Sequence, residues 1–99
     1  MNNEQILIEA IKNRKLIDFY YEDKPIRRAA PHAIYQSTTG KENLDAYQYY
    51  GYSESGNLPA WRVFTLDKME RVTVLDEDFQ EISEYKTNSE RYRNYIFKI

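Results

Sequence analysis

Residues 46–52 have the sequence AYQYYGY and residues 61–68 have the sequence WRVFTLDK, and these two runs decide the fold. Both are rich in the aromatic and β-branched residues that favour strands, whereas the Gly, Ser, Asn and Pro of residues 51–59 are typical of a loop. The sequence therefore predicts a β-hairpin. One surface of such a hairpin can carry aromatic rings beside cations, which suits a stacked, negatively charged ligand and suits a packed core almost as well.

The composition is that of one small globular domain covering residues 1–99, with 41% apolar and 30% charged residues. Cysteine is absent and histidine occurs once, so a disulfide or a thiolate metal site is excluded, and we predict neither a metal nor a cofactor. The N-terminus lacks the basic and apolar stretches of a signal peptide, and no apolar run approaches the roughly 20 residues that span a bilayer. We therefore expect a cytoplasmic protein with no membrane contact.

Charge is unevenly distributed along the chain, whose net charge is −2. Residues 76–84 hold five acidic side chains and no basic one, whereas Lys and Arg gather in residues 12–28 and again in residues 62–71. The net charge argues against a strong non-specific nucleic-acid binder, which would normally be basic overall. A local basic site on an acidic protein is still compatible with this pattern.

The pattern along the chain predicts a leading helix followed by about five short strands. Apolar residues at helical spacing indicate a helix over residues 4–13, and a second helix over residues 89–98 could begin at Ser89 as its cap. The predicted strands are residues 16–21, residues 26–30 with a continuation over 33–36 beyond Pro31, and residues 44–50, 61–66 and 71–75. The fold class is therefore mainly β (α+β), a small bent sheet or barrel with an N-terminal helix and a possible C-terminal helix.

Few residues suit catalysis. His32 has no positioned nucleophile beside it in the sequence, so hydrolase chemistry would rest on this one side chain. Asp76 and Asp78 are more typical of a solvated rim than of an acid–base pair, and the three glycines stand singly instead of forming a phosphate-binding loop. We predict that the protein is not an enzyme.

Basic and aromatic residues alternate on the predicted strands. Arg27 and Arg28 point to opposite faces of their strand, so one of them can reach a ligand. Tyr47 and Gln48 likewise face opposite sides of the strand that precedes Arg62. An arginine fork can hold a phosphate, and an aromatic ring can stack on a base. The alternative is that the rings form the core and the arginines make surface ion pairs, and composition alone favours this alternative.

Four short pieces of sequence, in this order, resemble the WYL domain family: FYY at residues 19–21, RRAAP at 27–31, LDAY at 44–47 and RVFTLDKM at 62–69. The likeness covers residues 5 to about 80. Glu42 and Asn43 stand where the family has tryptophan and tyrosine, and Thr65 and Lys68 stand where arginines are common. The resemblance implies an Sm-like β-barrel that senses ligands, often nucleic acid or nucleotides, commonly in bacterial transcription regulators or phage-defence proteins.

The residues and the resemblance together predict a regulatory, ligand-sensing domain that binds nucleic acid or a nucleotide through a basic-aromatic surface. We expect Arg27 and Arg62 to hold phosphate and Lys68 to add charge. The residues expected to position or stack the base are Tyr21, Tyr47 and Gln48.

The alternative function is a protein–protein interaction or dimerisation module without a small ligand. Aromatic residues and arginine are favoured at such interfaces. The interaction surface would consist of Tyr49, Tyr50, Tyr52 and Trp61. A homodimer would be built on the C-terminal helix, with Tyr92, Tyr95 and Phe97 as contacts.

Overall fold

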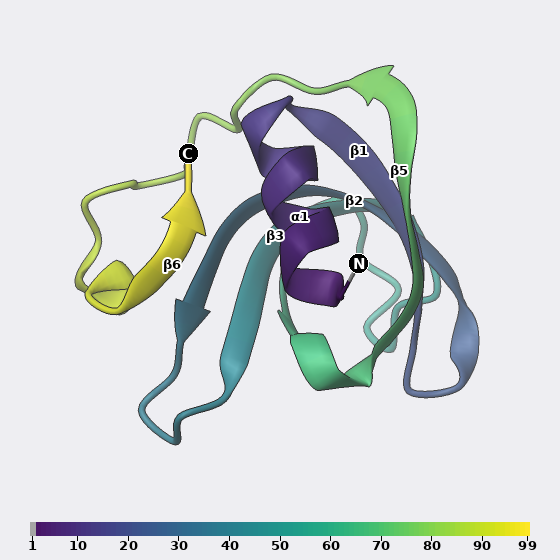
Figure 1. Cartoon of the computed structure of the whole chain (residues 1–99). Helices are drawn as coiled ribbons and strands as arrows, with labels where there is room; N and C mark the ends of the chain where they lie inside the picture. The colour runs from purple at the N-terminus through teal and green to yellow at the C-terminus, as the bar shows by residue number, and fades with distance from the viewer. Residues whose placement is uncertain (1) are drawn as a thin grey trace.

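Residues 2–99 are described by a computed structural model, in which an N-terminal helix lies against a strongly curved antiparallel sheet (Figure 1). The elements are α1 (Asn3–Lys12), β1 (Lys15–Tyr21), β2 (Lys24–Gln36), β3 (Glu42–Gly51), β4 (Ala60–Thr65), η1 (Leu66–Lys68), β5 (Met69–Asp78), η2 (Glu90–Tyr92) and β6 (Tyr95–Lys98), where η marks a 3-10 turn. The predicted mainly β class with a leading helix is confirmed.

The sheet follows the order β4–β3–β2–β1–β5, and β6 pairs with β2 beside this path. All five pairings are antiparallel within the described residues. The two end strands, β4 and β5, do not pair with each other, so the sheet of residues 2–99 is bent but open. The predicted closure into a barrel is not seen.

Helix α1 begins where the sequence predicts because Asn2 caps it. The Asn2 side chain accepts a hydrogen bond from the Gln5 backbone N–H at 2.9 Å. Leu7, Ala10 and Ile11 are fully buried in the main core, so α1 fills the inside of the curved sheet (Figure 1). In the described part of the chain, no helix is long and apolar enough to cross a lipid bilayer.

Strand β2 organises the sheet because it pairs with three other strands. Its first part pairs with β1, nearly its whole length pairs with β3, and residues 33–35 pair with β6. As predicted, Pro31 disturbs the strand, since the register against β3 shifts between Pro31 and Ala33, although the strand continues through it. Proline has no N–H to donate, and a bulge is a position where a sheet tolerates it.

The predicted C-terminal helix over residues 89–98 is wrong. Ser89 does cap a turn, since its hydroxyl accepts from the Arg91 N–H at 3.3 Å, but only the 3-10 turn η2 follows, and then strand β6. β6 covers the second half of β2, and the Ile99 N–H extends this contact by donating to the His32 carbonyl at 3.0 Å. Residues 95–98 therefore form a strand because they pair with the second half of β2.

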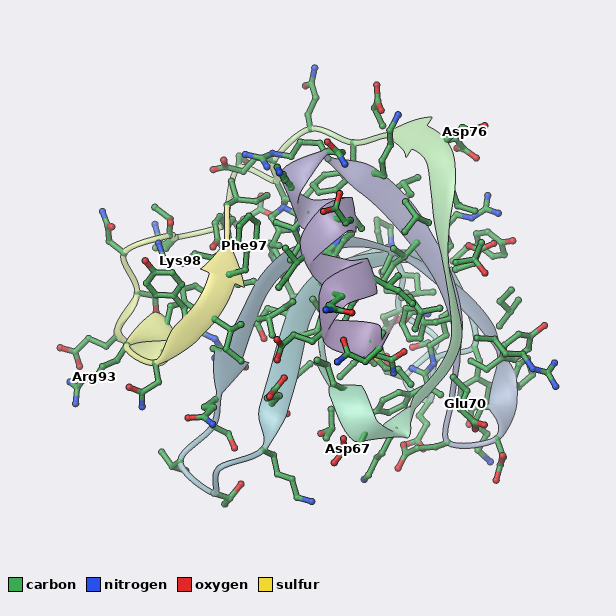
Figure 2. The ribbon with its side chains drawn as sticks, in the orientation of Figure 1. Asp67, Glu70, Asp76, Arg93, Phe97 and Lys98 are labelled. Carbon is green, nitrogen blue, oxygen red and sulfur yellow. The ribbon has the colours of Figure 1, made fainter. Side chains whose placement is uncertain are left out.

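The three residues predicted to form a dimer face on that helix are separated in the structure. Tyr92 is buried, Phe97 packs against the main core, and Tyr95 is exposed. Phe97 and Lys98 leave β6 on opposite sides, as neighbours on a strand do (Figure 2). A dimer built on a C-terminal helix is therefore excluded.

A second core lies on the outer face of the sheet, around His32. This side chain is fully buried, and its ring centre lies 4.8 Å from that of Trp61 and 5.1 Å from those of Phe79 and Tyr85. The aromatic neighbours place His32 in a packed interior and not in a cleft.

His32 joins the C-terminal segment to β2. Its Nε2 accepts a hydrogen bond from the Ile82 backbone N–H at 3.1 Å, so Nδ1 carries the proton and donates to the Ala30 carbonyl at 2.9 Å. Both ring nitrogens are thus occupied by the backbone. Burial lowers the pKa of the imidazole, so the neutral form is the one that the fold requires.

We expect acidification to destabilise the protein through His32. Its pKa in the folded state lies below the usual 6.5, so the unfolded chain takes up the proton first, and the free energy of unfolding falls as the pH drops below about 6.5. Denaturant unfolding at a series of pH values measures this fall. His32→Gln keeps a donor and an acceptor but does not titrate, so its fall should be smaller. Equal falls in the two proteins would contradict the prediction.

Candidate functional site

Arg27 of β2 is 7% exposed, and its guanidinium lies among three aromatic rings. The guanidinium carbon is 5.2 Å from the ring centres of Tyr21 and Tyr52 and 5.4 Å from that of Phe64. These distances are those of cation–π contacts. We call these four residues the arginine cage.

One glycine allows the strands of the cage to meet. Arg27 pairs with Phe19 of β1 on one side and with Gly51 of β3 on the other. Gly51 has a φ of 107°, and a Cβ at this position would lie 2.7 Å from the Arg27 Cα, so only glycine permits the approach. The next residue, Tyr52, donates its N–H to the Ile26 carbonyl at 3.2 Å, which holds its ring beside Arg27.

Arg27 has no carboxylate at ion-pair distance within residues 2–99, and the acid that acts on its charge is Glu22, which pairs with Lys68. Arg27 forms no ion pair there, and its buried Nε has no hydrogen-bond partner. Burial is the main cause that lowers the pKa of the guanidinium. Tyr21, the Glu22 carboxylate and Tyr52 oppose this shift, and the neighbouring charge of Arg62 adds a smaller lowering. A buried cation without a carboxylate is destabilising, and the contacts with the rings offset part of that cost.

Arg62 of β4 is the second cation at this end of the sheet. Its guanidinium donates to the hydroxyls of Ser53 and Ser55 at 3.0 and 2.7 Å and to the Trp61 carbonyl at 3.1 Å. These acceptors are neutral, and no carboxylate of the described chain pairs with Arg62. Arg62 therefore lies near Arg27 without a carboxylate partner in the described chain, and two neighbouring arginines favour an anion.

Gln48 of β3 supports the cage. It is fully buried, and its Nε2 donates to the carbonyls of Tyr50 and Tyr52 at 3.3 and 2.8 Å. Its Oε1 has no hydrogen-bond partner among the described residues. Gln48 thus fixes the backbone that carries the Tyr52 ring.

Two predicted site residues lie apart from the cage. Tyr47 faces the outer side of the sheet, where its ring centre is 5.4 Å from that of Trp61. Because neighbours along a strand face opposite sides, Tyr47 and Gln48 cannot belong to one surface. Lys68 is exposed on η1, and its Nζ lies 3.3 Å from a Glu22 carboxylate oxygen. The predicted residues that the structure does bring together are Tyr21, Arg27, Gln48 and Arg62.

A groove of about 520 Å³ lies beside β4. One wall consists of Trp61, Arg62 and Val63 of β4, and the other belongs to residues 84–92. We call this hollow the β4 groove. Arg62 borders both the groove and the arginine cage.

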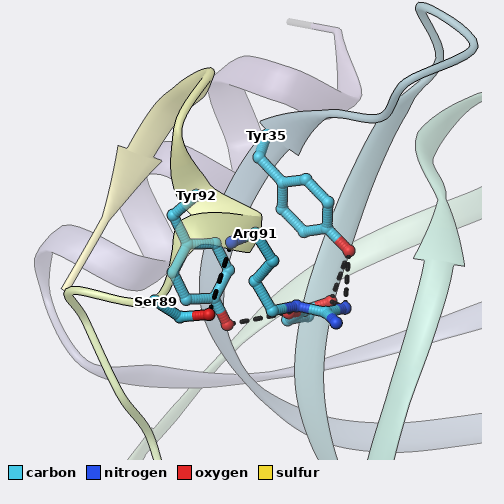
Figure 3. A network of polar contacts seen from close by, with 5 residues as sticks. Tyr35, Ser89, Arg91 and Tyr92 are labelled. Atoms are coloured by element: carbon cyan, nitrogen blue, oxygen red, sulfur yellow. Dashed lines mark hydrogen bonds and ion pairs between the residues drawn. The ribbon is translucent and has the colours of Figure 1, made fainter.

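Asp45 lines this groove and binds the residues of its second wall by hydrogen bonds. The carboxylate, 5% exposed, accepts hydrogen bonds from the hydroxyls of Tyr35 and Tyr92 at 2.8 and 2.7 Å. Arg91 donates to it twice, at 2.8 and 3.1 Å, from the turn that Ser89 caps (Figure 3). Burial and the carboxylate charge raise the pKa of Tyr35 to about 12 and raise that of Tyr92, so both hydroxyls stay donors.

No protein-family model, curated protein or solved structure matches the chain. The site is therefore assigned from its own geometry. The described residues contain no group of three or more His, Asp or Glu placed to hold a metal ion.

Tyr52 and Phe64 are the cage residues that the sequence analysis does not assign to the ligand site, and it assigns Tyr52 to the alternative interaction surface instead. Phe64 shares a strand face with Arg62, and this spacing is the signal that could have identified it. Tyr52 reaches Arg27 only through the close approach at Gly51, for which a lone glycine in a loop-like stretch is no specific signal.

Removal of Arg91 should destabilise the domain, because Asp45 would stay buried without its cation. Loss of one partner from a fully buried pair costs about 3–5 kcal/mol, and since about half of the Arg91 side chain is exposed we expect Arg91→Ala to cost about 2 kcal/mol. Arg93→Ala is the matched control, because within residues 2–99 Arg93 pairs only with the exposed Glu90. Urea denaturation measures both variants, and equal losses would contradict this role of Asp45.

Proposed function

We propose that this chain is a regulatory ligand-sensing domain that binds a nucleotide or a nucleic-acid strand, without catalysis, through phosphate at the arginine cage. One observation carries the proposal: Arg27 is a buried cation with no carboxylate partner among residues 2–99. The nearby Arg62 has neutral partners only. A phosphate supplies the counter-ion that this pair lacks.

Of the two arginines, Arg62 is the more accessible one, and we expect it to bind the phosphate directly. Its bonds to the hydroxyls of Ser53 and Ser55 are bonds to neutral acceptors, which a phosphate oxygen can replace with a gain. Charge-assisted hydrogen bonds are about twice as strong as neutral ones. Arg27 adds a second positive charge from the cage. The half-buried Tyr52 ring lies beside both Arg27 and Lys24, whose Nζ is 5.6 Å from the ring centre, and a base that displaces the Lys24 side chain can stack there.

The two arginines set the salt dependence of binding. For single strands, log affinity falls against log salt with a slope of about −0.7 for each phosphate neutralised, so two contacts give a slope of about −1.4. A net charge of −2 provides no long-range attraction for a polyanion. The site therefore suits a nucleotide or a short strand better than a long duplex.

The resemblance to the WYL family belongs to this proposal, together with the Sm-like barrel, the bacterial regulatory role and the cytoplasmic location expected with it. The leading helix and the five-strand antiparallel path support this assignment. The Thr65 N–H also donates to the Tyr21 hydroxyl at 2.9 Å and so links β4 to β1 across the opening of the bent sheet.

Arg27→Gln should weaken ligand binding about tenfold or more, because a hydrogen bond to a charged group contributes about 1.5–3 kcal/mol. Fluorescence anisotropy with short labelled single-stranded DNA, the same strand as RNA and a labelled nucleoside triphosphate measures the affinity. Arg28→Gln is the matched control, since Arg28 is adjacent on β2 but faces the other side and pairs with Asp18 at 2.7 Å. Equal losses in the two variants, or no binding by the wild type, would overturn the proposal.

Arg27→Met separates binding from stability. If Arg27 is present for a ligand, an apolar residue of similar length removes the buried charge and raises the free energy of unfolding by about 1 kcal/mol, while ligand binding is lost. Phe64→Ala is the reference for a structural cage residue and should lose about 3 kcal/mol or more. Urea denaturation without ligand decides between the two, because a loss of that size in Arg27→Met would make the cage purely structural.

Protein interaction is the second candidate function, and exposed aromatic residues on β3 favour it. Tyr49 and Tyr50 are 37% and 49% exposed. Tyr52, by contrast, belongs to the cage, and Trp61 lines the β4 groove. The predicted interaction surface is thereby reduced to these two tyrosines of β3.

A further inference from the structure

Strand β4 ends the sheet and leaves one edge unpaired. In the order β4–β3–β2–β1–β5 it has β3 as its neighbour, and the register between these two strands runs without a shift. No other strand of residues 2–99 pairs with its outer edge, and β1 reaches that edge only at Thr65, through the Tyr21 hydroxyl. Such an edge offers backbone N–H and C=O groups to an extended segment of another chain.

The alternation of the backbone shows which groups face outward. The Thr65 N–H donates to the hydroxyl of Tyr21 of β1 across the opening of the sheet, so it does not face β3. Residues two apart along a strand point the same way, so the N–H and C=O groups of Val63 and Trp61 face the outer edge as well. The Trp61 carbonyl accepts from Arg62, which leaves Val63 to offer both a donor and an acceptor. The Val63 side chain is 50% exposed.

The β4 groove lies over the face that β3 and β4 form, since Asp45 of β3 lines it together with its partner Val63. Its β4 wall carries Trp61, the single tryptophan of the chain, and Tyr85 lines the opposite wall. A strand added along β4 would place every second side chain on the groove side. Aromatic walls of this kind are favoured at protein interfaces.

The charges at the groove favour an acidic partner. Arg62 and Lys86 line it, and neither pairs with a carboxylate of the described chain. The carboxylate oxygens of Asp45 are both engaged by hydrogen bonds from its own network. Glu84 is the other acid in the lining, so two unpaired cations face one carboxylate.

We propose that an extended acidic segment of a partner protein binds here by adding a strand to β4, with apolar side chains over the groove and carboxylates against Arg62 and Lys86. A second copy of this chain is a poorer occupant, because pairing two β4 edges would bring the same two cations of both copies together. This function goes beyond phosphate binding at the arginine cage, and of the cage region only Arg62 borders both sites.

A phage-displayed library of random peptides, selected on the whole chain, tests the charge and the pattern. Enriched peptides should alternate apolar residues with Asp or Glu, and the synthetic versions should change the fluorescence of Trp61. Lys86→Glu should weaken them about tenfold, whereas Lys12→Glu, an exposed reversal on α1 outside the groove, should not. No enrichment, or enrichment of peptides without acidic residues, would overturn the proposal.

Val63→Pro tests the backbone contact. Proline removes an N–H that faces outward, and edge strands tolerate proline there, so the fold should be kept. Val63→Thr keeps the N–H and is the matched control. Peptide affinity should fall about tenfold in the first variant and stay unchanged in the second, with urea denaturation to verify that both are folded. Equal affinities would overturn the proposal.

If Val63→Pro does not fold, N-methylated peptides test the same backbone contact from the side of the peptide. Methyl groups on alternate peptide amides block strand pairing while leaving the side chains unchanged. At the pairing positions they should abolish binding to the wild type. Undiminished binding of every methylated peptide would overturn the proposal.

Other occupants of the edge give different results. A second copy gives a mass that rises with concentration in light scattering and that Val63→Pro reduces to the monomer. A nucleic-acid strand gives binding that both Lys86→Glu and Arg27→Gln weaken. Either result without peptide binding overturns the proposal. Arg27→Gln should bind the peptides as tightly as the wild type does, even if the arginine cage binds no nucleotide, so failure of the proposed phosphate site can be told apart from failure of this one.

Discussion

The buried carboxylate of Asp45 is the interaction on which the outer half of the structure depends. A carboxylate leaves water only when hydrogen bonds replace its hydration, and Tyr35, Arg91 and Tyr92 supply four. Two of these residues belong to η2, so the bonds hold residues 84–92 against β3. The second wall of the β4 groove exists because this anchor holds it, and His32 fixes the preceding segment through the Ile82 N–H.

The two faces of the sheet differ in whether their buried polar groups have hydrogen-bond partners. On the outer face, Asp45 and His32 have every main acceptor and donor occupied, which is the rule in native proteins. On the inner face, Arg27 Nε and Gln48 Oε1 are buried without partners in residues 2–99. The buried polar groups of the outer face are thus hydrogen-bonded, whereas the inner face holds a buried charge without a partner. Such a departure from the usual rule is expected at functional sites.

Sequence patterns predicted the elements wherever one pattern dominated, as for the capped helix at residues 3–12 and the strands from β1 to β5. Residues 92–99 match a helical spacing but are also rich in aromatic and β-branched residues, so the local pattern is ambiguous. They form a strand because the second half of β2 offers an edge to pair with. That edge is a tertiary feature, and no local sequence pattern contains it. In the candidate site, strand alternation and the family resemblance pointed to Arg27 and Arg62, which the structure places near each other. The same alternation separates Tyr47 from Gln48, and the Tyr52 contact needed tertiary structure to be seen.

β6 pairs with β2 across most of the described chain, so this contact joins segments that are far apart in the sequence. Bringing distant segments together costs conformational entropy, which only the finished contacts offset. While β6 and η2 are detached, the second half of β2 has a bare edge and Asp45 lacks the cation of Arg91. Local opening of this one segment would therefore expose an unpaired strand and an unpaired acid together, and a bare strand edge is a template for pairing with another chain.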